Sequence, residues 1–215
     1  MKILKILAVI VAALVAVVAV IAGVASTRPD QMHIERSKVI AASPADLYPY
    51  ANNFDLWMTW NPWNDLDPKQ VVTHSESREG VGAWYHWKGN DQVGEGQMTI
   101  TASEAPNKVV SKLEFIAPFQ SVAQVTMTFT PDGEGTKVTW AMDEDLKLMS
   151  KVMGLFMDMD QMLGDDFNKG LNKLAPLAEA AASKRLEAEA AAAAAAQAAA
   201  AGTDAVAGEA AAAVQ

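Results

Sequence analysis

Residues 124–142 read QVTMTFTPDGEGTKVTWAM, and this stretch decides the fold. Its large apolar residues alternate with polar ones on both sides of a glycine-rich centre: Val125, Met127 and Phe129 before it, and Val138, Trp140 and Met142 after it. Such alternation is typical of strands with one buried and one solvated face. The central DGEG at 132–135 is a hairpin signal, because glycine supplies the positive φ that tight turns need. The stretch therefore predicts neighbouring antiparallel strands rather than a parallel sheet covered on both faces.

Three upstream segments alternate in the same way. Their inward residues are expected to be Val81, Ala83, Tyr85 and Trp87, then Met98 and Ile100, then Val109, Leu113 and Phe115. Two short helices are expected before them. Ser43 and Pro44 have the residue types of an N-cap and a first helical position, and residues 54–60 predict a second short turn that Pro62 stops.

A long C-terminal helix is predicted to begin near Asp145 or Leu146. Apolar residues at helical spacing form one broad stripe along it: Leu148, Val152, Leu155, Phe156, Met159, Met162, Leu163, Phe167, Leu174 and Leu177. Pro176 is expected to kink or end this helix, or to restart a second one. Beyond it, residues 178–215 are mostly alanine, which predicts helix at first and disorder from Gly202 onward.

The N-terminus has the composition of a membrane segment. Residues 6–25 are all Ile, Leu, Val, Ala or Gly, and twenty helical residues span about 30 Å, the thickness of a bilayer core. Lys2 and Lys5 precede the run, which predicts a single-pass protein of the inner (cytoplasmic) membrane with its domain on the periplasmic side. The alternative for residues 1–27 is a cleaved secretory signal, although signal cores usually have only about 7–15 apolar residues. Residues 30–177 remain as one folded domain.

Composition excludes several functions. A net charge of −9 argues against nucleic acid, whose phosphates need Lys and Arg partners. With no cysteine and only three histidines, a metal centre is not expected. No serine nucleophile elbow, phosphate-binding glycine loop or dinucleotide fingerprint is present, so no cofactor is predicted.

Several motifs occur in an order that resembles one family. They are WMTWNPW at 57–63, GVGAWYHWKGN at 80–90, GEGQM at 94–98, PF at 118–119, GTKVTW at 135–140 and MGLFM at 153–157. Together they resemble the bacterial polyketide cyclase/dehydrase-like proteins of the START-like (SRPBCC) superfamily, over residues 32–177. The resemblance implies an α+β helix-grip fold, in which a curved antiparallel sheet and two short helices wrap a long C-terminal helix. It also implies a deep cavity suited to lipids, sterols or polyketide-like aromatics, without one shared catalytic constellation.

The candidate site residues follow from the inward faces of strands and helix together with this resemblance. The expected cavity wall is Tyr85, Trp87, Met98, Phe115, Phe119, Met127, Trp140, Phe156, Met159, Leu163 and Asp166. The expected cavity mouth is Trp57, Trp60 and Trp63. For Asp166 two interpretations stay open: a polar group or general acid inside the cavity, or a carboxylate that a bend near Gly164 exposes to water.

Three functions remain open at this point. The leading hypothesis is binding or transport of a hydrophobic small molecule beside the membrane. The second is a cyclase or dehydratase, which requires ionisable groups that converge inside the cavity. The third is a non-catalytic cell-envelope interaction protein that acts through its alanine-rich tail, which a filled interior would favour.

Overall fold

Seven antiparallel strands form one curved sheet in the computed structural model, which describes residues 2–212. The strands are β1 (Gln31–Ile40), β2 (Val71–His74), β3 (Trp84–Lys88), β4 (Glu95–Glu104), β5 (Lys108–Ala117), β6 (Ser121–Asp132) and β7 (Gly135–Asp145). Their order is β1-β7-β6-β5-β4-β3-β2, so β1 pairs with the last strand while each of the others lies beside its neighbour in sequence. The antiparallel sheet expected from the alternation is confirmed.

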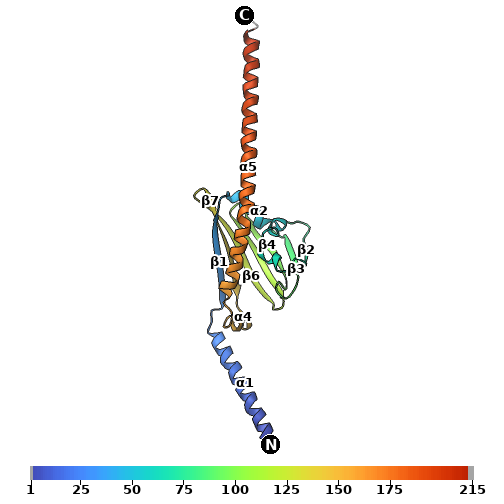
Figure 1. Ribbon diagram of the computed structural model, residues 1–215, viewed down its shortest axis with the longest axis vertical. Coiled ribbons are helices and arrows are strands. Elements are labelled where there is room, and N and C mark those ends of the chain that lie inside the picture. Colours follow the sequence, from blue (N-terminus) through green and yellow to red (C-terminus); the bar gives the residue numbers. More distant parts are fainter. Residues whose placement is uncertain (1, 213–215) are drawn as a thin grey trace.

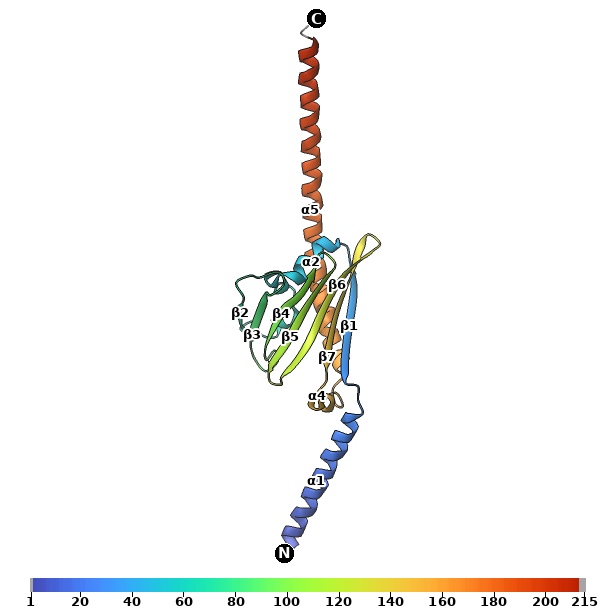
Figure 2. The same ribbon diagram turned by 180° about the vertical axis from the view of Figure 1, so that it is seen from behind.

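Helical segments accompany this sheet, and some of them cover its concave face. They are α1 (Lys2–Ser26), α2 (Pro44–Asn52), α3 (Phe54–Trp57), the 3₁₀ turn η1 (Pro62–Asp65), α4 (Leu148–Met153) and α5 (Met159–Ala212). Figure 1 shows the first half of α5 lying across the sheet, and Figure 2 shows the sheet wrapped around it from behind. The helix α1 leaves from one end of the domain, and α5 projects beyond the other. The helix-grip fold is therefore confirmed.

The short helices begin where the sequence predicts. Ser43 caps α2 in a capping box: its Oγ accepts from the Asp46 backbone N–H, and the Asp46 carboxylate accepts from the Ser43 N–H at 3.2 Å. The same carboxylate binds Arg185 of α5, at 2.7 Å from Nε and 3.0 Å from Nη2. The first element after β1 is thus tied to the long helix.

The alternation of apolar and polar residues along the strands predicts the buried residues correctly, with one exception. The inward residues Met98, Ile100, Val109, Leu113, Val125, Met127, Phe129, Val138, Trp140 and Met142 are all buried. Val81 is wrong: it is 64% exposed, because β3 begins only at Trp84 and Val81 lies in the turn between Gly80 and Gly82, both of which have positive φ.

The long helix does not begin near Asp145. Strand β7 ends there, α4 runs from Leu148 to Met153, and α5 starts only at Met159. Gly154 ends α4, and the Asp158 carboxylate accepts the Gln161 backbone N–H at 3.0 Å, as an N-cap does. The helical stripe predicted from Leu148 to Leu177 is therefore wrong across residues 154–158, and Phe156 does not lie on a helix.

The helix α5 passes through Pro176 without ending. Pro176 is exposed, so the carbonyl that loses its N–H partner there can bind water instead. Ala178 and Ala182 are still buried beyond residue 177, and the helix runs to Ala212 where the sequence led us to expect disorder from Gly202.

Candidate ligand-binding site

A cavity of about 300 Å³ lies between the concave face of the sheet and α5. Its wall combines side chains from the short helices, five strands and the long helix: Trp57, Asn61, Trp63, Leu66, Gln70, Tyr85, Trp87, Gln92, Val93, Met98, Leu113, Phe115, Val125, Trp140, Met142, Met162, Leu163, Asp166 and Phe167. Leu66 and Gln92 are solvent-exposed, so the cavity opens on their side. The volume is at the lower end of the range for small-molecule sites.

Trp140 of β7 is the centre of the aromatic packing that limits the cavity. Its ring stacks on Phe167 of α5 at 4.2 Å between centroids, and the edges of Trp57, Trp60 and Trp63 approach it at 5.2, 5.2 and 5.7 Å. Such offset and edge-to-face pairs stabilise beyond simple area burial. The tryptophan-rich segment therefore fills one end of the interior and leaves the remainder as the cavity.

Two glycines permit the closest approaches to these rings. A Cβ on Gly170 would lie 2.7 Å from Trp140 Cζ3, so α5 can rest directly on the indole. A Cβ on Gly96 would lie 2.4 Å from Trp87 Cζ2, which lets that ring cover β4. Because these positions carry no side chain, α5 can pack closely on Trp140 and the Trp87 ring can pack closely on β4.

Tyr85 supplies a polar group deep in the cavity wall. Its hydroxyl accepts a hydrogen bond from Trp57 Nε1 at 3.2 Å, and both residues are buried. No acceptor for the hydroxyl proton is present among residues 2–212, so this proton can be donated to a bound molecule. Burial raises the pKa of the Tyr85 phenol, which keeps it neutral at ordinary pH.

Asp166 lies on the cavity wall with its carboxylate held from two sides. One oxygen accepts from Trp63 Nε1 at 3.2 Å and the other from Lys169 Nζ at 2.8 Å. The carboxylate is about four-fifths buried, whereas Lys169 extends into solvent. The structure thus combines the two interpretations: Asp166 lines the cavity, and a charged partner from the surface compensates it.

The structure brings most of the expected wall residues together. Those that line the cavity are Tyr85, Trp87, Met98, Phe115, Trp140, Leu163 and Asp166, together with Trp57 and Trp63 of the expected mouth. Trp60 does not: it is fully buried, and its Nε1 donates to the Tyr50 carbonyl at 3.1 Å. Met127 is also core, because it lies farther along β6 than the cavity extends.

Three other expected wall residues lie outside the cavity. Phe119, Phe156 and Met159 line a wider, open cleft of about 870 Å³ at the end of the domain where α1 departs. Phe119 occupies the β5–β6 turn, and Phe156 occupies the α4–α5 connection rather than a helix. Both phenylalanines are therefore exposed.

Sequence reasoning missed ten residues of the wall. Strand parity and the helical stripe mark five of them as inward: Leu113, Val125, Met142, Met162 and Phe167. The others, Asn61, Leu66, Gln70, Gln92 and Val93, lie in turns or between elements, where no periodicity exists. Most of the polar edge of the cavity belongs to this second group.

Comparison with known proteins agrees with this architecture. No functionally curated protein matches the chain. A crystal structure of a Chromobacterium violaceum protein aligns with a TM-score of 0.51 at 15% identity, over 71% of this chain and 99% of its own. A Rhizobium loti protein aligns with a TM-score of 0.52 at 14% identity, over 68% and 96%. These likenesses concern the fold. The model of the family described as "Polyketide cyclase / dehydrase and lipid transport" matches residues 31–179, and the chain belongs to that family.

Proposed function

We propose that this protein binds a hydrophobic small molecule in the cavity between the sheet and α5, and that α1 anchors the domain in the inner membrane with the cavity on the periplasmic side. The observation that carries the binding proposal is the apolar cavity itself, walled by Trp57, Tyr85, Trp87 and Phe115. Aromatic and methionine walls with a few polar groups are typical of small-molecule sites. Membership of a family named for cyclase and lipid-transport proteins supports the same class of ligand.

The anchor is supported by the N-terminal helix. The helix segment Lys5–Ser26 is long and apolar enough to cross a bilayer. Residues 5–20 are exposed, and the segment contacts the domain only near its end, where Ala25 is buried. A core helix of a water-soluble domain would bury one face. The lysines at positions 2 and 5 favour retention of the N-terminus in the cytoplasm.

The binding proposal is tested by filling the cavity. Full-length protein is released from membranes in mild detergent and analysed by native mass spectrometry for co-purifying molecules. We expect a bound species on the wild type and on Met98→Leu, which keeps the side-chain volume, and its loss from Met98→Trp. Leu163→Trp is a second plug, with Leu186→Trp on the exposed side of α5 as its control. The proposal would be overturned if the wild type carried no ligand, or if Met98→Trp and Leu163→Trp both folded and kept the bound species.

A cyclase or dehydratase is the second candidate, because Tyr85 and Asp166 both line the cavity. Buried Tyr85 is a neutral donor, and the Asp166 carboxylate is engaged by Trp63 and Lys169. Proton transfer would require one of these groups to exchange partners. If the co-purified molecule changes mass on incubation, and Asp166→Asn stops the change, catalysis is supported. A guest recovered unaltered supports carriage.

A further inference from the structure

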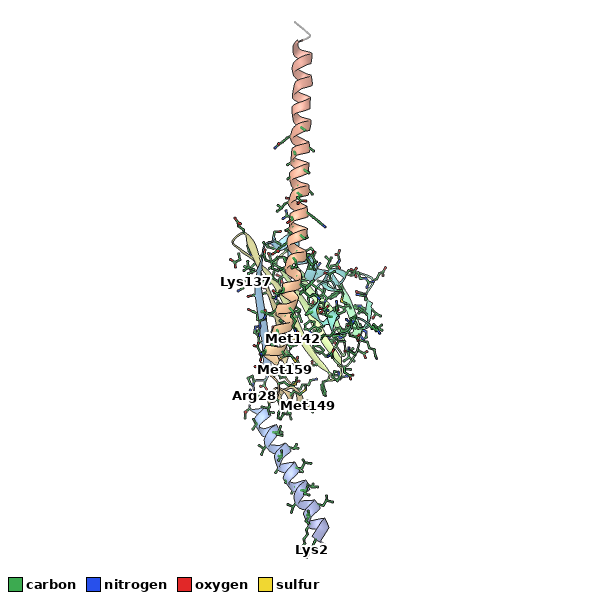
Figure 3. The ribbon with its side chains drawn as sticks, viewed as in Figure 1. Lys2, Arg28, Lys137, Met142, Met149 and Met159 are labelled. Atoms are coloured by element: carbon green, nitrogen blue, oxygen red, sulfur yellow. The ribbon has the colours of Figure 1, made fainter. Side chains whose placement is uncertain are left out.

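Exposed apolar side chains gather at the end of the domain from which α1 departs. Phe156 is 73% exposed and Phe119 57%, and Leu148, Met149 and Met157 are exposed beside them. Figure 3 shows Arg28, Met149 and Met159 at this end, next to the C-terminal end of α1. These five side chains, Phe119, Leu148, Met149, Phe156 and Met157, are called the apolar rim below. Large apolar side chains grouped on a surface mark an interaction site.

The position of the apolar rim relative to α1 identifies what covers it. The helix α1 ends at Ser26, and α4, which carries Leu148 and Met149, packs against it. Ala25 in the last turn of α1 is fully buried. If the span Lys5–Ser26 crosses a bilayer, α4 therefore lies at the level where that span leaves the hydrocarbon.

The connection between anchor and domain is held in place. Lys151 of α4 is buried, and its ammonium group binds the Asp30 carboxylate and the Arg28 carbonyl. Only residues 27–30 separate α1 from β1, and this ion pair ties them to α4. The linker therefore holds the apolar rim close to the anchor rather than letting the domain turn freely away from it.

The cleft behind the apolar rim adjoins the ligand cavity. Phe119, Phe156 and Met157 line the cleft, while Phe115, Met142 and Leu163 line both the cleft and the cavity. Those three shared residues form the partition between the two spaces. An apolar molecule leaving the bilayer at the rim would meet this partition directly.

We infer that the apolar rim docks into the outer leaflet of the membrane that holds α1, so that the cavity exchanges its guest with that leaflet through the cleft. This inference rests on the membrane anchor of the proposed function and deepens it. Aromatic and methionine side chains suit the boundary between headgroups and acyl chains. The charges around the rim are mixed, with Arg28 and Lys147 exposed near Asp30 and Asp158. Docking is therefore apolar and independent of anionic lipid.

The chain has no cysteine, so single cysteines can be labelled without background. We would place an environment-sensitive nitrobenzoxadiazole label at Phe119→Cys, Met149→Cys or Phe156→Cys in the full-length protein, reconstituted in phosphatidylcholine vesicles. Lipids carrying a doxyl quencher near the headgroup should quench all three labels. The matched controls are Val39→Cys and Val81→Cys, which are equally exposed but lie beside α2 and α3 at the opposite end.

Three outcomes would overturn docking. Labels on the rim that respond to a water-soluble quencher as strongly as the controls would show a rim in solvent. Labels shielded from both quenchers would show a protein contact, such as a second copy. Quenching that appears only when anionic phosphatidylglycerol is added would indicate that the contact with the membrane is electrostatic and not apolar. Because the labels need no ligand, failure here leaves the mass-spectrometric result on the cavity intact, and the reverse also holds.

Discussion

At the scale of single residues, Tyr85 joins packing to the chemistry of the cavity. Its ring meets Phe54 at 4.8 Å and Trp87 at 5.5 Å between centroids, and its hydroxyl satisfies the indole N–H of Trp57. A buried donor left without a partner costs about 1–3 kcal/mol, more than a typical hydrogen bond contributes. The Tyr85 hydroxyl is thus required by the fold as well as available to a guest.

This pair leads to the first prediction. Tyr85→Phe should lower the free energy of unfolding by about 1–3 kcal/mol, because the Trp57 N–H loses its buried acceptor. Denaturant titration of the detergent-solubilised protein, followed by tryptophan fluorescence, measures the change. In the double variant Trp57→Phe with Tyr85→Phe the two losses should not add, since no donor is stranded. Strict additivity would contradict the hydrogen bond.

At the scale of elements, α2 and α5 are joined by one carboxylate. Asp46 caps its own helix and binds Arg185, which lies about five turns beyond Phe167, the last cavity residue of α5. The Arg185 guanidinium, with help from Ser43, lowers the pKa of Asp46 to about 2. The side chain of Asp46 is nearly buried, whereas Arg185 is 40% exposed, so water weakens the pair.

The depressed pKa gives the second prediction, a pH dependence. The carboxyl titrates near 3.9 when unfolded and near 2 when folded, so its contribution is complete above about pH 5 and is lost as the pH falls toward 2. Asp46→Asn should therefore reduce the free energy of unfolding by about 1–2 kcal/mol at pH 7, and the difference from wild type should shrink below pH 4. Glu189→Gln removes the outer partner of Arg185 and is the control, with a much smaller effect expected. A difference that stays constant down to pH 2 would argue against the pair.

The connection between α4 and α5 shows why element boundaries matter for function. Had the stripe from Leu148 to Leu177 formed one helix, Phe156 would point into the cavity. Gly154 and the capping Asp158 interrupt it, and Phe156 becomes part of the apolar rim instead. The short α4–α5 connection therefore places Phe156 on the exposed apolar rim instead of the cavity wall.

At the scale of the whole molecule, the first part of α5 packs on the domain and the second part projects beyond it. Ala178 and Ala182 are buried against the domain and Arg185 is paired, whereas the described side chains from Leu186 to Ala198 are exposed or nearly so. Figure 1 shows this second half of α5 extending away from the sheet, at the end opposite α1. The stable domain thus includes about two turns of the alanine-rich segment.

Truncation tests this boundary as the third prediction. Removing residues 190–215 should leave the melting temperature and the co-purified guest unchanged, because the described side chains of this range, 190–198, are all exposed. Removing residues 178–215 should lower the melting temperature by several degrees, since two buried alanines and the Asp46 partner are removed. Equal melting temperatures would show that the segment after Leu177 does not stabilise the domain.

The sequence alone determined the strand faces, the helix cap at Ser43, the membrane-like first helix and the helix-grip arrangement, because each follows from local periodicity or from an ordered set of motifs. It also indicated the aromatic half of the cavity wall through the inward positions Tyr85, Trp87 and Trp140. Only the tertiary structure decided that Trp60 is core, that Phe119 and Phe156 line an outer cleft, and that Gln70 and Gln92 form part of the cavity edge. Those positions lie in turns, or depend on how far an aromatic ring reaches across the interior. Neither property produces a repeating pattern in the sequence, so neither could be predicted from it.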